Sequence, residues 1–155
     1  IQVWIPAQSD STRVKNKNTR DFVNGKSLLE IKLEQLSKAV AVSNIYVSGN
    51  SQDTEEIVTR IGANYIQRPI ELLGNEISQK ILFQHFFDNT PTSDYVLWVQ
   101  VTDPFFVDFK GLCAETPPRP YESIVVASTL RKHGFYKDDP INFCFGCCVC
   151  FIGFL

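Results

Sequence analysis

The sequence contains no methionine, not even at position 1, and only two histidines among its 155 residues. We read the missing methionine as a sign that the natural start of the chain is absent, or that the chain is a fragment. No apolar run approaches the roughly 18 to 20 residues that a membrane-spanning helix needs. The first apolar run, Ile1 to Ile5, has the length of a strand and not of a secretory signal core. We therefore expect neither a membrane partner nor a signal sequence in this chain.

Net charge is also low, at -2. This balance gives no bulk attraction to nucleic acid, so we expect no nucleic-acid partner, and any anion site must be built from local charges. The five cysteines lack the spacing of a disulfide scaffold, because Cys113 stands alone and the others crowd positions 144, 147, 148 and 150. This usage indicates a reducing, cytoplasmic compartment.

Strand and helix patterns alternate along the chain, whose length predicts about one domain. We expect strands at 1–5, 44–48, 63–69, 94–100 and 123–128, and helices at 27–40, 51–62 and 77–87. Ser27 and Glu30 fit a capping box before the first helix, and Gly62 is a stop signal for the second. Strands separated by helices predict an α/β fold with a mostly parallel sheet, which binds ligands beyond the carboxyl ends of its strands.

The loop after the first strand, IPAQSDSTRVKNKN at 5–18, holds three cations and no glycine. Its hydroxyl and cationic side chains are of the types that grip phosphates near the mouth of a strand. It has neither the Walker pattern nor the G-x-G-x-x-G fingerprint. From spacing alone, a solvated polar loop is an equal alternative. Gln100, after the fourth strand, is expected to face the same crevice as this loop.

Four segments in order resemble the sugar-acid cytidylyltransferases. The loop and the following GKSL are similar to I-P-A-R-x-x-S-[KT]-R-x-x-x-K-N and G-K-S/P-L of that family. The later segments are IYVSGNSQDTEEIVTRIGANYIQRPIELLGNEIS, YVLWVQVTDPF and FYKDDPINF. The resemblance covers about residues 1–143, expected to form a nucleotide-binding α/β domain, and leaves 144–155 as an atypical Cys-rich apolar tail. It is nearest to the acylneuraminate (CMP-sialic acid synthetase) branch, although STR also suits the ketodeoxyoctonate branch.

This resemblance implies a three-layer, Rossmann-like nucleotidyltransferase fold that is incomplete at its C-terminal end. The implied activity is transfer of CMP from CTP to an acidic sugar, sialic acid or a related nonulosonate, with release of pyrophosphate. Mg²⁺ is the implied cofactor, bridging the phosphates, and a homodimer is implied for full-length members. The acidic pair that usually binds the metal is not found in this chain, so no metal ligand is predicted. The alternatives are a catalytically inactive nucleotide-binding fragment and a ketodeoxyoctonate-type enzyme.

The resemblance also implies roles for single residues. Lys17 and Arg13 are the implied catalytic groups, which neutralise the triphosphate. The implied nucleotide-binding residues are Ala7, Gln8, Ser11, Arg13, Lys17, Asn18, Arg68 and Ser78. Arg68 matches the arginine that reads cytosine, whose O2 and N3 accept hydrogen bonds. Gln100 and Thr102 are implied contacts of the sugar acid.

Structural alternatives stand beside these roles. Arg68 also fits a surface arginine at a strand end, Gln100 a strand cap and Asn18 a turn residue. Gln8 stands where the family usually has an arginine, and a lost charge-assisted bond weakens phosphate binding by about 1.5–3 kcal/mol. Asn50 replaces a frequent aspartate. We assign Tyr65, Trp98 and the phenylalanines of 83–87 to the core. We expect no catalytic role for His85 or His133. For the tail, a buried strand is favoured over a zinc site.

Overall fold

A computed structural model of the chain describes residues 1–9, 14–74, 76–93, 95–102, 104–105, 108–114, 125–126 and 149–153. Its main sheet has the strand order β5-β4-β1-β6-β8-β7. The strands are β1 (Gln2–Ala7), β4 (Ile45–Gly49), β5 (Asn64–Gln67), β6 (Tyr95–Val99), β7 (Val125–Val126) and β8 (Val149–Gly153). Strands β5, β4, β1 and β6 run parallel to one another, whereas β8 is antiparallel to both β6 and β7. The predicted α/β fold with a mostly parallel sheet is therefore confirmed.

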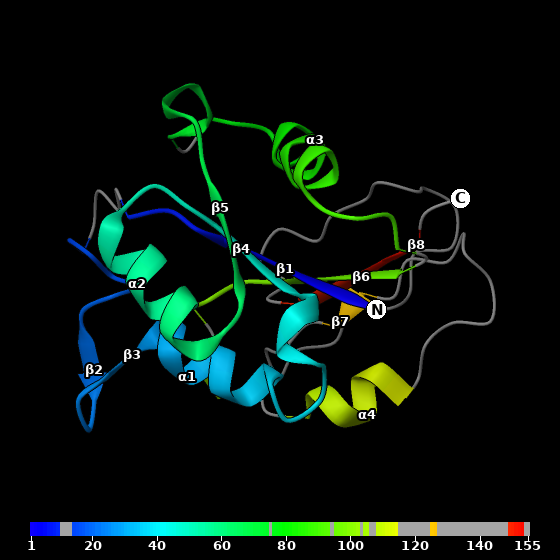
Figure 1. Ribbon diagram of the computed structural model, residues 1–155, viewed down its shortest axis with the longest axis horizontal. Coiled ribbons are helices and arrows are strands. Elements are labelled where there is room, and N and C mark those ends of the chain that lie inside the picture. Colours follow the sequence, from blue (N-terminus) through cyan, green and yellow to red (C-terminus); the bar gives the residue numbers. More distant parts are fainter. Residues whose placement is uncertain are drawn as a thin grey trace.

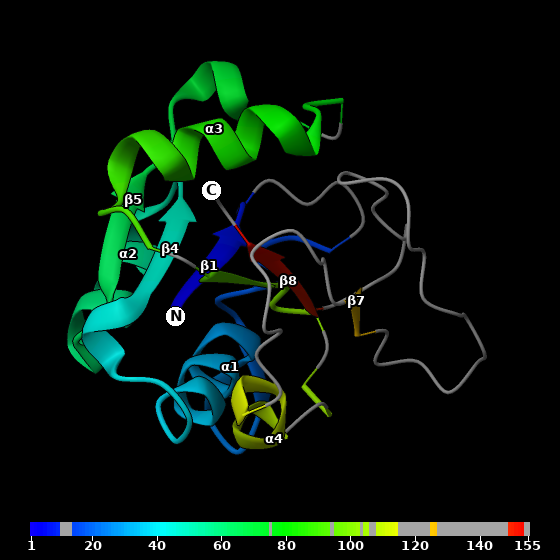
Figure 2. The same cartoon turned by 90° about the vertical axis from the view of Figure 1, so that its right-hand side faces the viewer.

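Helices cover both faces of this sheet (Figures 1 and 2). Helices α1 (Leu28–Leu36), α2 (Gln52–Ile61) and α4 (Phe109–Ala114) pack on one face, and α3 (Gln79–Asn89) packs on the other. Two short 3₁₀ turns, η1 (Val42–Asn44) and η2 (Ile70–Leu72), lie in the connections. The predicted three-layer arrangement is thus present, with β1 in the middle layer.

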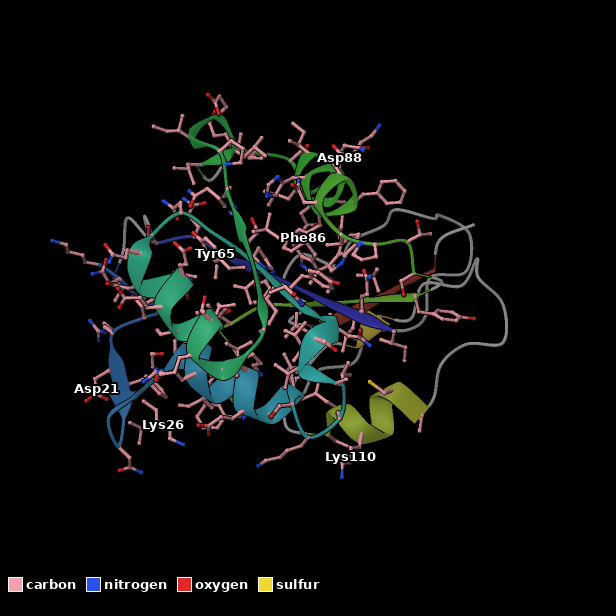
Figure 3. All side chains as sticks on the ribbon, in the orientation of Figure 1. Asp21, Lys26, Tyr65, Phe86, Asp88 and Lys110 are labelled. Carbon is pink, nitrogen blue, oxygen red and sulfur yellow. The ribbon has the colours of Figure 1, made fainter. Side chains whose placement is uncertain are left out.

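Alternation along the strands divides the core into two clusters. Val3 and Ile5 face the α1 and α2 side, whereas Trp4 faces α3. On the α3 side the Phe86 ring stacks on Trp4 at a centroid distance of 5.3 Å and meets Trp98 edge-on at 5.6 Å. Figure 3 shows Phe86 between α3 and the sheet. Core positions for Trp98 and Phe86 are therefore confirmed.

Not every aromatic residue follows the prediction. The Phe87 side chain is 50% exposed, so its assignment to the core is wrong. One helical residue turns the side chain by about 100°, which places Phe87 on the outer side of α3 when Phe86 faces the sheet. Tyr65 is only partly buried against the larger core cluster, and its hydroxyl donates to Gln67 Oε1 at 3.1 Å.

The element boundaries differ from the sequence predictions in several places. The first helix ends at Leu36 and not at residue 40, because the N–H groups of Ala39 and Val40 both bond to the Leu36 carbonyl in a tight turn. A small hairpin, β2 (Asp21–Val23) and β3 (Lys26–Ser27), was not predicted, and neither was α4. Of the predicted strand at 123–128, only Val125–Val126 is described as strand.

The tail contributes a strand to the sheet. Residues Val149–Gly153 form β8, whose register with β6 runs from Tyr95 opposite Gly153 to Val99 opposite Val149. The strand alternative for the tail is therefore supported at these positions. Cys144, Cys147 and Cys148 lie outside the described residues, so the zinc alternative stays untested. None of the helices in the described ranges has the length and apolar content that crossing a membrane requires.

The predicted capping box at the start of α1 is confirmed. Ser27 Oγ accepts from the Glu30 N–H at 3.2 Å, and Glu30 Oε2 accepts from the Ser27 N–H at 2.7 Å. Burial raises the pKa of Glu30, but the hydrogen bonds from Ser27 and the ion pair with Arg60 outweigh it and lower this pKa overall. The box therefore holds α1 and, through Arg60, ties it to α2.

Replacing Ser27 by alanine is expected to lower the free energy of unfolding by about 1 kcal/mol, because one orphan N–H at the helix start loses its acceptor. Urea unfolding followed by circular dichroism measures the change. The control is Ser37→Ala, since Ser37 lies at the other end of α1, is exposed, and its hydroxyl donates to the Glu34 carbonyl. A loss for Ser37→Ala as large as that for Ser27→Ala would contradict the capping role.

Candidate functional site

The order of the strands in the sheet reverses direction at β1, because β4 and β6 lie on opposite sides of it. From β1 the chain passes through α1 to β4 on one side, whereas β6, reached through α3, lies on the other side of β1. Parallel pairing brings the carboxyl ends of β5, β4, β1 and β6 to one edge, which lies on the left in Figure 1, at the end of β1 opposite the N mark. Ligands of open α/β sheets bind at such a switch point.

The predicted phosphate loop begins at this edge and is held from two sides. Ala7 ends β1 and is buried, and the Gln8 carbonyl accepts from Asn18 Nδ2 at 3.0 Å. The Ser9 N–H and hydroxyl both donate to Asn50 Oδ1, at 2.9 and 3.0 Å, just after β4. Asn50 thus supplies the acceptor that an aspartate would supply, without placing a negative charge beside the loop. Ser11 and Arg13 lie outside the described residues.

Lys17 and Asn18 lie in a turn that closes the loop. Asn16 has a left-handed backbone, with φ of 51°, and its carbonyl accepts from the N–H groups of Thr19 and Arg20. The Asn18 carbonyl accepts from the N–H of Leu29, the second residue of α1, at 3.0 Å. Lys17 is half-buried beside this residue. Asn18 is therefore a turn residue, as the structural alternative predicted, and its side chain also supports the predicted nucleotide loop through the Gln8 carbonyl.

Asn18 also presents an unused acceptor. Its side chain is only 6% exposed, and its Oδ1 atom is fully buried without a hydrogen-bond partner in the described part of the chain. A buried polar atom without a partner costs about 1–3 kcal/mol. An amino or hydroxyl group of a ligand that reached this atom would recover that free energy.

Arg68 lies at the carboxyl edge of the sheet and is buried there. It follows β5, its backbone N–H donates to the Gly49 carbonyl at 2.7 Å, and its side chain is only 3% exposed. The surface alternative for this arginine is therefore wrong. Within the described ranges no carboxylate forms an ion pair with it, in contrast to Lys26 and Arg60, which pair with Glu34 and Glu30. Burial lowers the pKa of Arg68 to about 10, so the group is still charged at neutral pH.

The Arg68 guanidinium uses one of its two forks on the protein. Nε donates to the Ser48 hydroxyl at 3.1 Å, and Nη2 donates to the Ser48 carbonyl at 3.0 Å. These two atoms form the side-on fork of the planar group. The end-on fork, Nη1 together with the second hydrogen of Nη2, makes no hydrogen bond to a described residue. A fixed, planar pair of donors is thereby left for a ligand with two adjacent acceptors.

Two residues of this cluster were missed by the sequence analysis. Ser48, at the end of β4, is fully buried beneath Arg68. His85 on α3 reaches the same hydroxyl, with 3.1 Å between its Nε2 and Ser48 Oγ. Burial lowers the pKa of His85, and the nearby positive charge of Arg68 lowers it further. The available signal was a histidine on the buried side of an otherwise apolar helix. This signal could not identify Ser48 as its partner, because only the fold brings β4 next to that side of α3.

The remaining predicted residues lie apart from this cluster. Ser78 is exposed, and its hydroxyl caps α3 by accepting from the Ile81 N–H at 3.4 Å. Gln100 follows β6 and is half-buried, and Thr102 is exposed nearby in the chain. The loop that carries them is braced from α1, because Gln35 Nε2 donates to the Pro104 carbonyl at 2.7 Å. The structure thus places Gln100 at the same edge as β1 and Arg68 but records no bond between them.

Comparison with known sequences identifies a family. A sequence profile described as Cytidylyltransferase matches residues 3–107, more than half of the chain. The chain is 32% identical over 69 residues to 3-deoxy-manno-octulosonate cytidylyltransferase 2 of Hydrogenovibrio crunogenus. This alignment covers 44% of the chain and 27% of the relative. The match therefore spans about a quarter of that relative's length.

Solved structures show the same fold. The CTP complex of CMP:2-keto-3-deoxy-manno-octonic acid synthetase has a TM-score of 0.65 at 16% identity, covering 98% of this chain and 73% of that one. A cytidylyltransferase from Leptospira borgpetersenii also has a TM-score of 0.65, at 18% identity, with coverages of 98% and 59%. At these identities the likeness shows the fold, a Rossmann-like nucleotidyltransferase fold, and nothing about substrates.

Proposed function

Because this chain belongs to the cytidylyltransferase family, we propose that it binds CTP at the carboxyl edge of its sheet. We further propose that the protein to which it contributes transfers CMP from CTP to an acidic sugar and releases pyrophosphate. The observation that carries the nucleotide part is the buried Arg68, anchored through one fork on Ser48 and without a carboxylate partner in the described residues.

Arg68 suits cytosine for a geometric reason. Cytosine presents O2 and N3 as adjacent acceptors, which match two parallel N–H donors of a guanidinium. Uracil presents a donor at N3, so the same fork would meet one acceptor and one opposing N–H. A site with buried polar groups rejects the ligand that leaves them unpaired. The end-on fork of Arg68 is therefore expected to favour CTP over UTP.

The triphosphate belongs to the loop after β1. Lys17, from the turn at Asn16–Arg20, would neutralise phosphate charge, with Arg13 and Ser11 beside it in the family pattern. Such transfer depends mainly on positioning and on neutralising the charge of the phosphates. The loop starts at Ala7 and Gln8, and Asn18 is bonded to the Gln8 carbonyl. The buried Asn18 Oδ1 could accept a hydrogen bond from a donor group of the nucleotide.

Magnesium and a homodimer enter the proposal from the family resemblance alone. Among the described residues no three His, Cys, Asp or Glu side chains gather into a group that could hold a metal ion. This part of the chain does not fit a metal held by protein carboxylates, and we derive no step through it. The intracellular location inferred from the cysteines likewise stays a prediction.

The name of one relative supports one acceptor. The Hydrogenovibrio crunogenus relative, 32% identical over 69 residues, is named for 3-deoxy-manno-octulosonate. We therefore propose the ketodeoxyoctonate type ahead of the sialic-acid type that the sequence resemblance favoured. Gln100 and Thr102 are the proposed contacts of the acid. Turnover assays that follow pyrophosphate release with each sugar acid would separate the two.

Nucleotide binding is tested first, by thermal-shift titration with CTP, UTP, ATP and GTP. Ligand at 100 times its dissociation constant stabilises a protein by about 2.7 kcal/mol, a shift of several degrees. We expect this shift with CTP and a smaller one or none with the others. No shift with any nucleotide would overturn the proposal. A shift with CTP but no pyrophosphate release would favour the alternative, an inactive nucleotide-binding fragment, which the partial coverage of the relatives motivates.

Restoring the family arginine is expected to tighten binding. Gln8→Arg adds a cation where the loop leaves β1, and a charge-assisted hydrogen bond contributes about 1.5–3 kcal/mol, which is tenfold or more in affinity. Calorimetric titration with CTP measures the gain. Gln84→Arg is the control, because it adds the same charge at an exposed position on α3. Equal gains for both variants would mean that net charge, and not the loop, is responsible.

A further inference from the structure

The proton positions in the Arg68–Ser48–His85 cluster can be worked out from its hydrogen bonds. Arginine donates only, so the Arg68 Nε–H must point to the Ser48 hydroxyl oxygen. Among the described residues, Ser48 Oγ makes one other hydrogen bond, with His85 Nε2 at 3.1 Å. The hydroxyl hydrogen of Ser48 is itself buried, since the residue has no exposed surface. It therefore needs an acceptor inside the cluster.

His85 Nε2 is the acceptor that the described residues offer. If Nε2 carried a hydrogen, two donors would face Ser48 Oγ and its own hydroxyl hydrogen would be left buried without an acceptor, which is unfavourable. A neutral ring with its hydrogen on Nδ1 avoids this cost. Burial and the charge of Arg68 both lower the pKa of His85, against the smaller raising effect of Asp88, and so favour the neutral ring.

We propose that His85 is a positioning residue for nucleotide selection: its unprotonated Nε2 accepts from the Ser48 hydroxyl, which in turn accepts from Arg68 Nε and so fixes the guanidinium plane. The chain of bonds runs in one direction, from Arg68 through Ser48 to His85. It leaves only the end-on fork of Arg68 for the base. This inference rests on the proposed function of Arg68 and adds what sets its orientation.

The cluster joins three elements that are far apart in the sequence. Ser48 is the last residue but one of β4, Arg68 follows β5, and His85 lies on α3, on the opposite side of the sheet from α1. The Phe86 ring, packed on Trp4 next to His85, fixes the rotation of α3 about its axis. A shift of α3 would therefore move Nε2 away from Ser48 and free the guanidinium to turn. Base selection is thereby coupled to the packing of the α3 face.

The experiment compares CTP with UTP and with inorganic triphosphate by calorimetry on the whole chain. His85→Leu removes the acceptor, whereas His85→Gln supplies a side-chain carbonyl in its place. We expect His85→Leu to weaken CTP binding about tenfold, as for one lost hydrogen bond to a charged network. Binding of UTP and triphosphate should be unchanged, and His85→Gln should recover most of the preference for CTP. Gln84→Ala, the exposed neighbour on α3, is the control and should bind as the parent does.

The outcomes separate the inference from the proposed function. Failure of the parent chain to bind CTP overturns the proposed function itself. If the parent binds CTP but His85→Leu keeps the full preference, or loses affinity equally for all three ligands, the positioning role is wrong. Nitrogen NMR of the unaltered chain shows which ring nitrogen of His85 carries the hydrogen, and this measurement does not depend on whether a variant folds. The sequence has only two histidines, so His133→Gln assigns the signals, and a hydrogen on Nε2 of His85 would contradict the inference.

Discussion

Replacing Arg68 by methionine is expected to weaken CTP binding by about a hundredfold or more and to abolish the preference for CTP over UTP. The base loses two hydrogen bonds from a charged donor, each contributing about 1.5–3 kcal/mol, and 1.4 kcal/mol corresponds to a tenfold change. Methionine fills the space of the side-chain stem without a charge. Calorimetry with the two nucleotides gives both quantities.

The Arg68→Met change should weaken nucleotide binding without lowering the free energy of unfolding of the empty protein. The Arg68 charge is buried without an ion pair in the described residues. Replacing it by an apolar side chain removes the cost of burying that charge, which offsets the hydrogen bond that the Ser48 carbonyl loses. We expect the empty Arg68→Met protein to be no less stable to urea than the parent. Arg68→Lys keeps the charge but loses the fork, so it should retain part of the affinity and lose the selectivity.

A suitable control is Arg60→Met. Arg60 is an exposed arginine on α2 that pairs with Glu30, away from the carboxyl edge. It should leave nucleotide binding unchanged and lower stability slightly, because an exposed ion pair contributes about 0–1 kcal/mol. If Arg68→Met bound CTP as well as Arg60→Met does, the assignment of the base site to Arg68 would be wrong.

Removal of the Phe86 ring is expected to have the largest effect on stability, a loss of about 3–5 kcal/mol for Phe86→Ala. Phe86 is fully buried and contacts Trp4 and Trp98 on adjacent strands, so its loss opens a cavity at the centre of the smaller core cluster. Urea unfolding gives the free energy. Trp fluorescence should report the same transition, because both tryptophans line the cavity.

Phe87→Ala is the matched control for this prediction. The two phenylalanines are adjacent on α3, yet Phe87 is 50% exposed and Phe86 is not exposed at all. We expect the Phe87 change to be small, within about 1 kcal/mol, as for most surface substitutions. Comparable losses for the two variants would show that α3 does not pack on the sheet through the Phe86 face.

The parts of the fold that depend on local patterns could be predicted. Alternating strands and helices gave the parallel sheet, Ser27 with Glu30 gave the start of α1, and Gly62 gave the end of α2, where its φ is 90°. The β2–β3 hairpin was missed although its signal is present. Asn24 and Gly25 both have positive φ, as a two-residue hairpin turn requires, and Asn-Gly is the dipeptide that most favours it.

The site was predicted less completely, and the reason is distance along the chain. The resemblance pointed to Ala7, Asn18 and Arg68, but not to the partners that hold them. Ser48 lies 20 residues from Arg68 and 37 residues from His85. Such contacts depend on which strands become neighbours and on the rotation of α3, and neither has a local signal. The burial of Arg68 was likewise invisible, because Arg before Pro at a strand end reads equally well as a surface residue.

The Arg68 charge, which has no ion pair among the described residues, bears on the amount of the protein in a cell. The empty protein holds a desolvated cation that the described residues do not neutralise, and bound nucleotide would supply the missing acceptors. Ligand binding and resistance to unfolding are therefore linked. Changes of 1–2 kcal/mol in stability alter cellular abundance several-fold, because proteases and chaperones act on the unfolded fraction. Under the proposed function, the supply of the nucleotide would then help to set how long each copy survives.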